Sequence, residues 1–334
     1  MTAVVGLAGR NLSRTPRLLP RARLVPAALA ALLVVGLTTS PGRAGGDAEV
    51  LRRAQAASST VAFEGTVVVR WFDGDGARHE QSMPVRGNGG ELELGAGVQQ
   101  PALSWTGGVG TTRNAPDPTS KYQVRAELGP LVLDRPTTRV LLDLDGRLTE
   151  EADVDDASGL LLRRQVYDAR GATVRVVEFT ALEGLQAASP AGQPLRAAWK
   201  VPRVDEVPRP FRAPDQLAGG YARLGAYRRG PAVQVLYGDG VRTLSVFSQL
   251  GEAEPSALPA GGELLSIGAA PGRRWTWAGG QVVTWSHRGI TTTVVGDGPP
   301  AEVLTAARSL PDPIDPDMLA HLRQGSRRVI RVLV

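Results

Sequence analysis

The clearest alternation of apolar and polar positions in the chain lies in residues 61–71. The residues that share one face of an extended strand there are almost all apolar, namely Val61, Phe63, Gly65, Val67, Val69 and Trp71. Residues 47–60 carry apolar side chains at helical spacing behind Asp47, a favourable helix N-cap. Residues 73–76, Asp-Gly-Asp-Gly, have the chemistry of a tight hairpin. The pattern predicts a helix, a strand with one buried face, and a turn that begins an antiparallel sheet.

Further strands are expected as far as residue 182, because no helix-length apolar pattern interrupts this part of the chain. Residues 121–128 alternate strictly and place Tyr122, Val124, Ala126 and Leu128 on a face expected to be half-buried. Apolar stretches bounded by turn residues predict strands at 77–86, 103–105, 138–144, 160–168 and 173–180. So many antiparallel strands indicate a large curved sheet, either a sandwich, a barrel, or an open barrel with helices on one face.

A second unit of strands is expected after a change in composition. Residues 184–215 hold six prolines among small and charged residues, which indicates an extended connection. Strands are then predicted at 232–237, 241–247, 273–277, 281–287 and 289–295. Gly298-Pro299-Pro300 precedes a final helix over 301–310. The expected fold class is therefore mainly β (α+β), with an N-terminal unit over 47–183, the connection, a smaller unit over 216–311, and a tail over 312–334.

Composition fits a folded chain of two domains. The 334 residues suffice for two cores, and 42% hydrophobic with 21% charged residues is typical of globular proteins. The absence of cysteine means that core burial, without disulfides, must stabilise the fold. The basic residues include only two lysines, Lys121 and Lys200, and this preference for arginine is typical of a GC-rich genome rather than of nucleic-acid binding.

The net charge of +5 comes from the N-terminus. Residues 1–46 contain six arginines and no acidic residue, which leaves the remainder nearly neutral. A basic segment, an apolar run of about 15 residues and the small-residue run PGRAGG have the layout of a secretory signal. Cleavage near Ala44 is the preferred interpretation, and an uncleaved membrane anchor is the alternative. Both place the body of the protein outside the cytoplasmic membrane, exported or held in the cell envelope.

Residues able to carry catalysis are scarce. Each of the three histidines, His79, His287 and His321, stands without a second histidine or an acidic partner at metal-ligand spacing. No cysteine nucleophile and no GxSxG serine is present. The glycine pairs at 107–108 and 219–220 lack the strand and helix of a phosphate-binding loop. The sequence therefore predicts that the protein is not an enzyme, with no catalytic residue, metal site or cofactor.

Three other groups of residues have plain structural interpretations. The acidic group that could suggest calcium lacks the glycine and terminal glutamate of a helical calcium loop, and is expected to be a solvated turn: Glu150, Glu151, Asp153, Asp155 and Asp156. Tryptophans that could line a groove are expected to pack in cores: Trp71, Trp105, Trp275, Trp277 and Trp285. Basic tail residues that could touch acidic lipid are expected to be a frayed end: Arg323, Arg327, Arg328 and Arg331.

Three stretches resemble one known family. Residues 51–69, LRRAQAASSTVAFEGTVVV, resemble a family start in which a helix leads into an aromatic-x-Gly-Thr strand. Residues 155–171, DDASGLLLRRQVYDARG, are similar to the family's D-x-x-[ST]-G-L-x-x-R hairpin. Residues 236–247, LYGDGVRTLSVF, with 291–300, resemble its C-terminal domain. Together they resemble the MucB/RseB family of sigma-E factor regulatory proteins, in its actinobacterial form. Residues 95–120, the proline-rich connection and the tail beyond about 312 depart from it.

The resemblance implies a fold and a function. The N-terminal domain would be a LolA-like half-barrel of antiparallel strands with helices against its concave face, followed by a smaller β-rich domain. The protein would bind the external part of a membrane anti-sigma factor, control its proteolysis, and release it in envelope stress, with a lipid-like ligand favouring release. The alternative is a lipid or lipoprotein carrier, and an envelope hydrolase is disfavoured by the missing nucleophile. No binding residue follows from the resemblance, and the oligomeric state stays open.

Overall fold

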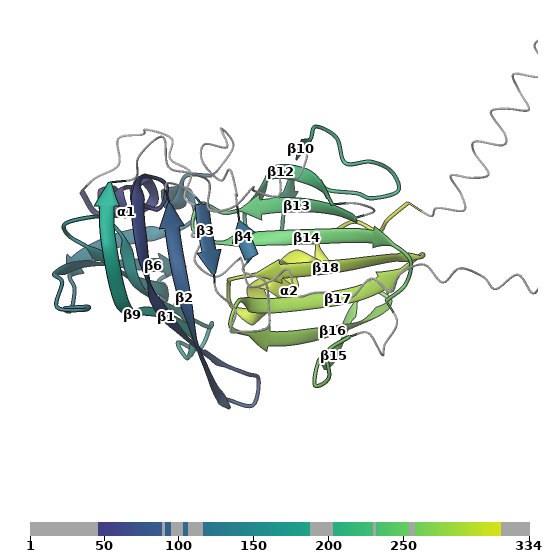
Figure 1. Cartoon of the computed structure of the whole chain (residues 1–334). Helices are drawn as coiled ribbons and strands as arrows, with labels where there is room; N and C mark the ends of the chain where they lie inside the picture. The colour runs from purple at the N-terminus through teal and green to yellow at the C-terminus, as the bar shows by residue number, and fades with distance from the viewer. Residues whose placement is uncertain are drawn as a thin grey trace, which may run out of the picture.

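The protein contains two antiparallel sheets that lie next to each other (Figure 1). The computed structural model describes residues 46–88, 91–94, 103–105, 116–187, 203–229, 232–253 and 258–314. The predicted signal segment 1–46, apart from Gly46, and most of the tail 312–334 lie outside these residues. The expected mainly β class is confirmed, and in the described ranges one α-helix accompanies each sheet.

The first sheet has nine strands in the order β4-β3-β2-β1-β9-β8-β7-β6-β5, so that β1 and β9 pair at its centre. The helix α1, Gly46–Thr60, lies against β5 and β6, and a 3-10 turn, Pro118–Ser120, precedes β5. The strands are β1 Val61–Phe72, β2 Arg78–Asn88, β3 Glu91–Leu94, β4 Leu103–Trp105, β5 Gln123–Leu128, β6 Thr137–Leu144, β7 Arg147–Asp155, β8 Leu161–Tyr167 and β9 Thr173–Ala187.

The predicted alternation of β1 forms the core of this sheet. Val67 and Val69 are fully buried and pack with Phe63 and Phe179, whose rings meet edge to face at 5.6 Å. The β1–β2 hairpin and the β8–β9 hairpin, on the two sides of the central β1–β9 pair, turn by the same chemistry. Asp73 accepts the backbone N–H groups of residues 75 and 77 on its side chain, and Asp168 does the same for residues 170 and 172. The turn residues therefore fix the register that buries the apolar face.

The second sheet follows the order β10-β12-β13-β14-β18-β17-β16-β15, with β11 also paired to β12. The helix α2, Pro300–Arg308, packs Val303, Ala306 and Ala307 into this sheet's core and confirms the predicted final helix. The strands are β10 Arg203–Val204, β11 Gln216–Leu217, β12 Tyr221–Arg229, β13 Ala232–Gly238, β14 Thr243–Leu250, β15 Glu263–Ile267, β16 Ala270–Trp277, β17 Gly280–His287 and β18 Ile290–Gly296.

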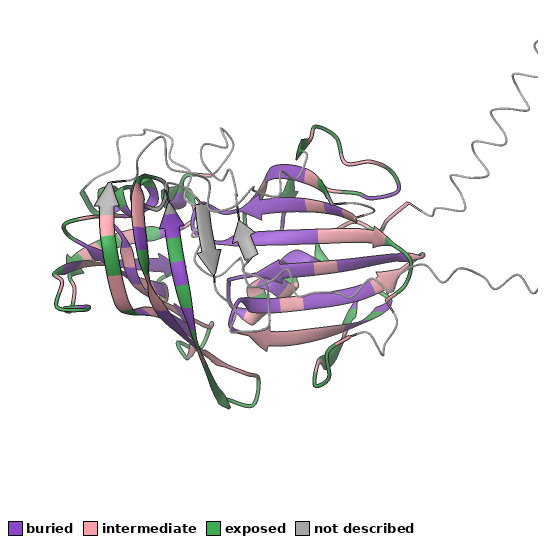
Figure 2. Cartoon of the chain, viewed as in Figure 1, coloured by how far each residue is buried: buried purple, intermediate pink, exposed green. Residues whose placement is uncertain are grey.

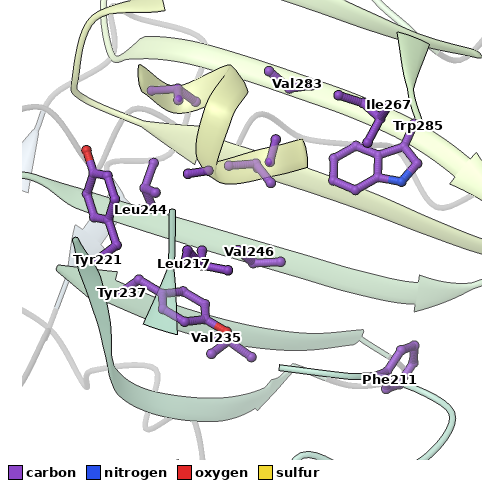
Figure 3. Close-up of a cluster of buried hydrophobic side chains, with 14 of the residues drawn as sticks. Phe211, Leu217, Tyr221, Val235, Tyr237, Leu244, Val246, Ile267, Val283 and Trp285 are labelled. Carbon is purple, nitrogen blue, oxygen red and sulfur yellow. The ribbon is translucent and has the colours of Figure 1, made fainter. Parts of the chain in front are cut away.

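The core of the second sheet lies between its strands and α2 (Figure 3). Tyr221, Tyr237 and Leu244 are fully buried there, and Trp285 closes one end of the cluster. Burial also distinguishes the two ends of β14 (Figure 2). Residues 243–246 are buried, and the strand becomes progressively exposed towards Leu250. The buried end belongs to the part of the second sheet that meets the first one.

Several strand predictions need correction. Leu128 is 90% exposed, although the alternation of residues 121–128 placed it on a half-buried face, because β5 is an edge strand and no part of the chain that the structure describes covers its last residue. The strand β12 was not predicted, since a register shift between Arg223 and Gly225 breaks its alternation. The predicted connection 184–215 begins inside β9, which runs to residue 187, and contains β10.

Candidate functional site

The most unusual feature of the molecule is a set of charged side chains buried between the two sheets, which we call the junction. Arg164 of β8 forms two hydrogen bonds to Glu150 of β7, at 2.7 and 2.9 Å. Its third contact, at 2.6 Å, reaches Asp297, which follows β18 in the second sheet. All three side chains are at least 98% buried. A paired Arg of this kind is strongly held because its planar fork matches a carboxylate.

A second arginine crosses the junction in the opposite direction. Arg242, just before β14, is fully buried and forms an ion pair with Glu302 of α2. Its Nε lies 3.3 Å from Glu150, and its Nη2 donates to the backbone carbonyl of Thr149 at 3.2 Å. Glu150 therefore accepts hydrogen bonds from one arginine of each sheet, and the two units share one carboxylate.

The third cation of the junction is Lys121, which precedes β5. Its Nζ lies 2.5 Å from Asp239 and 2.6 Å from Glu302, and it stands about 5 Å from the ring centroids of Tyr122 and Tyr221. Tyr122 also donates its hydroxyl to Asp239 at 2.6 Å. The turn that carries Asp239 approaches residues 116–118 so closely that a Cβ at Gly240 would stand 2.6 Å from the carbonyl oxygen of Pro116.

Burial and charge act in opposite directions on these groups. Burial would raise the pKa of Glu150, but the positive charges of Arg164 and Arg242 outweigh it and lower that pKa. Burial also opposes ionisation of Asp239, and Lys121 and Arg242 together lower its pKa as well. Both carboxyls are therefore ionised at neutral pH. The junction is a set of buried ion pairs, in which removing one partner leaves the other uncompensated.

A turn of the second sheet enters the core of the first. Trp277 and Ala278, at the β16–β17 turn, pack with the apolar cluster around Val67 and Phe179. Arg175 of β9 donates to the carbonyl of Gly279 in this turn at 2.9 Å. The turn needs glycine at position 280, where φ is +115° and a Cβ would stand 2.2 Å from the carbonyl oxygen of Gly296.

Arg175 itself is poorly satisfied. It is buried, its Nε and Nη2 have no hydrogen-bond partner among the described residues, and Asp297 lies 3.9 Å away. Burial, followed by the like charge of Arg164, lowers its pKa. Arg175 and Arg164 thus share one carboxylate, which Arg164 holds at hydrogen-bond distance.

The acidic group at residues 150–156 is not a solvated turn, and that prediction was wrong. The group lies on β7 and just after this strand. Alternation along a strand would expose only half of the group's side chains, and the buried ones are paired with arginines. Glu150 belongs to the junction, Asp153 binds Arg139 and Arg163, and Asp155 binds Arg135. Carboxylates can be buried on a strand when neighbouring strands supply guanidinium groups. Among the described residues no group of three or more His, Cys, Asp or Glu could hold a metal ion.

The remaining candidates lie apart from the junction, except for Trp277, whose turn enters the core of the first sheet. His79 is on the β1–β2 hairpin, stacked on Trp71 at 5.2 Å and 3.0 Å from Asp73. Trp285 is buried in the second core, as expected, and Trp275 donates to the carbonyl of Pro259. Gly219 and Gly220 form the turn before β12, both with positive φ. His321, the glycines at 107–108, the side chain of Trp105 and the basic tail residues lie outside what the structure describes.

The sequence pointed to Glu150 but missed its partners. Arg164, Arg242 and Asp297 come from segments that are more than 50 residues apart along the chain, and no local spacing connects them. One signal was available, because all three lie within or beside stretches that carry the family resemblance: residues 155–171, 236–247 and 291–300. Residues 51–69 also reach the junction, where Gln55 Nε2 lies 3.5 Å from the carbonyl oxygen of Gly240. None of the described helices is long and apolar enough to cross a membrane.

Comparison with known protein families and with curated proteins gives no match. Among solved structures, the fold is similar to that of MucB in the Pseudomonas aeruginosa MucA/MucB complex, with 20% identity and a TM-score of 0.44, covering 81% of this chain and 99% of that one. MucB in complex with MucA(peri) has 22% sequence identity and a TM-score of 0.41, and the match covers 80% of this chain and 99% of that one. The LolA superfamily protein NE2245 from Nitrosomonas europaea has 9% identity and a TM-score of 0.20, and the match covers 76% of this chain and 92% of that one. These likenesses concern the fold alone.

Proposed function

We propose that this chain is a non-enzymatic extracytoplasmic regulator, which binds the external part of a membrane anti-sigma factor and controls its proteolysis. It would thereby modulate an envelope-stress sigma factor. The sequence resemblance to MucB/RseB proteins supports this function, and MucB is the protein solved together with MucA. The signal-like segment 1–46 supports an exported location.

One observation carries the proposal. The stretches that resemble the family, which are far apart in the sequence, contribute Gln55, Arg164, Asp239, Arg242 and Asp297 to the same junction. Residues that only kept one sheet folded would have no reason to meet between two sheets. A junction of buried charge is an arrangement suited to fixing the relative position of two units, and a regulator that holds and releases a partner needs such a fixed position.

The first sheet also offers a surface for a partner segment. Leu128 is 90% exposed at the end of the edge strand β5, and Leu131 in the following loop is 68% exposed. An edge strand has backbone groups that an extended peptide can pair with, and exposed leucines beside it provide apolar contacts. We propose that an extended segment of the anti-sigma factor adds to β5 at this place.

The alternative function, a carrier of lipid or lipoprotein, would need room on the core face of the first sheet. That face is covered by α1, by Val132, and by Trp277 and Ala278 from the second sheet. Cargo would have to displace all of these, whereas a partner segment at β5 displaces none of the described residues. The regulator is therefore the function that this arrangement favours.

The test uses residues 47–334 and calorimetry against the extracytoplasmic segments of the same organism's anti-sigma factors. We expect saturable micromolar binding of one segment, with slower cleavage of that segment by an added protease. The absence of binding to every segment, together with a lipid that copurifies reproducibly, would instead favour the carrier.

The surface is tested by Leu128→Lys combined with Leu131→Lys. A charge on the leucine surface should weaken binding at least about tenfold, while stability changes by no more than about 0.5 kcal/mol because both side chains are exposed. The matched control is Leu264→Lys, a leucine 73% exposed on β15, the edge strand of the other sheet. Equal loss of binding in both variants would contradict the proposed surface.

A further inference from the structure

A cavity of about 290 Å³ lies in the second sheet, and none of its lining residues belongs to the junction. Strands β14, β17 and β18 form one side, and the β15–β16 turn closes one end. Residues 310–313, which follow α2, pass along its other side together with Phe211 and Arg212. The cavity is thus formed by segments distant in sequence that the core of the second sheet brings together.

The floor of the cavity is apolar and fixed. Val246, Ile290, Ile267, Phe211 and Trp285 line it, and each is more than 90% buried. Figure 3 shows the two aromatic rings and Ile267 at the same end of the buried cluster. Side chains that are held by a packed core provide a preformed surface for a flat or short apolar group, which costs little reorganisation on binding.

The rim carries the opposite chemistry. Three arginines, Arg212, Arg288 and Arg308, line the cavity with His287, against a single carboxylate, Asp312. None of the ion pairs among the described residues involves any of these arginines, whereas the arginines of the junction are paired with carboxylates. The one carboxylate stands 3.8 Å from His287. The rim therefore keeps a positive excess beside an apolar floor.

The arginines retain hydrogen-bond donors for a ligand. Arg212 and Arg288 each donate one N–H, at 3.4 Å, to the backbone carbonyls of residues 312 and 313. A guanidinium has five donors in a fork that suits carboxylate, sulfonate and phosphate oxygens. These contacts hold the arginines beside the opening and leave most of their donors free of described partners.

We propose that this cavity binds a small organic anion with a flat or short apolar body, such as an aryl carboxylate or aryl sulfonate. The apolar part would lie against Trp285 and Phe211, and the anionic group would meet Arg288 and Arg308. The volume is at the lower limit of small-molecule sites, which run from roughly 300 to 1,000 Å³, and is too small for a lipid with two acyl chains. The site is independent of the proposed anti-sigma partner.

The probe is 1-anilinonaphthalene-8-sulfonate, and its matched control is N-phenyl-1-naphthylamine, which has the same rings without the sulfonate. Residues 47–334 should bind the sulfonate at one site per chain, with quenching of tryptophan fluorescence by energy transfer. The neutral compound should bind at least about tenfold more weakly, because it gains nothing from the charged donors. Added salt should weaken binding of the sulfonate and leave binding of the neutral compound unchanged.

Two charge variants share the same change in net charge. The double variant Arg288→Gln and Arg308→Gln should weaken binding of the sulfonate about tenfold and leave binding of the neutral compound unchanged. Arg147→Gln with Arg170→Gln, at exposed turns of the first sheet, should change neither. Ser248→Phe, which fills the cavity from β14, should abolish binding of both compounds.

The proposal is overturned if the two compounds bind equally well, if both charge variants lose the same affinity, or if folded Ser248→Phe binds the sulfonate unchanged. If Ser248→Phe does not fold, the charge variants decide alone. Vesicles of phosphatidylglycerol distinguish a membrane headgroup from a free anion. Binding of the protein to vesicles that competes with the sulfonate assigns the same anion chemistry to a lipid source, and the absence of such competition assigns it to a free anion.

Discussion

The two sheets differ in how their cores are completed. Every described residue of the second core comes from residues 204–310, and its own helix α2 and the segments around β10 and β11 cover it. The two clusters of the first sheet contain Trp277, Ala278 and Val241, which belong to the second. Among the described residues, the first sheet is thus completed by its neighbour, whereas the second core holds no residue of the first sheet. We therefore expect packing between the two sheets to be needed for folding of the first unit only.

The ion pairs of the junction, unlike the apolar packing, draw on charged groups of both sheets. Glu150 takes one arginine from each sheet, and Lys121 of the first sheet binds two carboxylates of the second. Charges that separate can return to water, so this part of the junction specifies a position more than it adds stability. Apolar dependence and charge pairing can therefore be tested apart.

The largest effect is expected when the two units are produced separately. Residues 203–314 should unfold cooperatively on heating, because their core is complete, whereas residues 46–187 should not, because Trp277, Ala278 and Val241 are missing from theirs. Circular dichroism and hydrogen exchange measure both. A fragment 46–187 that unfolds cooperatively at the temperature of the intact chain would remove the proposed dependence.

Arg164→Met should be the most damaging single change at the junction. It leaves Glu150 without its bidentate partner and Asp297 without its close one, at an expected cost of about 3–5 kcal/mol of unfolding free energy. Arg175→Met is the matched control, since Arg175 makes one hydrogen bond, to the carbonyl of Gly279, while its Nε and Nη2 have no partner among the described residues, and a methionine fills similar space. Its effect should stay within about 1 kcal/mol by urea denaturation. Equal losses in the two variants would show that the specific pairing is unimportant.

Trp277→Ala should destabilise the first sheet by about 2 kcal/mol, because it removes a large side chain from a core shared between the units. Trp275, two residues earlier on β16, packs outside the first sheet's clusters, and Trp275→Ala should cost less than about 1 kcal/mol. Hydrogen exchange of β1 and β9 distinguishes the two. Faster exchange there in Trp275→Ala than in Trp277→Ala would reverse the assignment.

The smallest effect is expected from acid. The pKa values of Glu150 and Asp239 are lower in the folded chain, so their contribution is complete above the unfolded values of about 4 and is lost as the pH falls through the folded ones. Each unit of lowering is worth about 1.4 kcal/mol. Unfolding free energy measured below pH 4 should therefore decline less in Glu150→Gln than in the unmutated chain. An identical decline would exclude Glu150 as a cause.

Local chemistry made parts of the fold predictable from the sequence. The alternation of residues 61–71 identified the buried face of β1, and the Asp-x-x-Gly turns that begin at residues 73 and 168 gave hairpins of the same geometry. Both features depend on neighbours within a few residues. The same logic failed at Leu128, because alternation says which residues share a face and nothing about whether that face is covered.

The junction could not be predicted from local patterns. Arg164 and Asp297 are 133 residues apart, and a strand such as β7 with three buried carboxylates contradicts the usual preference of charge for water. Their burial depends on guanidinium groups from other strands, and these partners become known only when both sheets are in place. Trp277 was similarly expected in a core, but it packs against the first sheet's cluster as well as against Val295 of its own sheet.

Chemical labelling of Lys121 can report how often the two units separate. The protein has two lysines, and this one lies with a nearly buried amine held between Asp239 and Glu302. Amine acylation requires an accessible, neutral nitrogen, so the rate of labelling at Lys121 measures how often the two units part. Mass spectrometry of a short labelling pulse can therefore follow this opening in unmodified protein, in a living culture, before any partner or ligand has been identified.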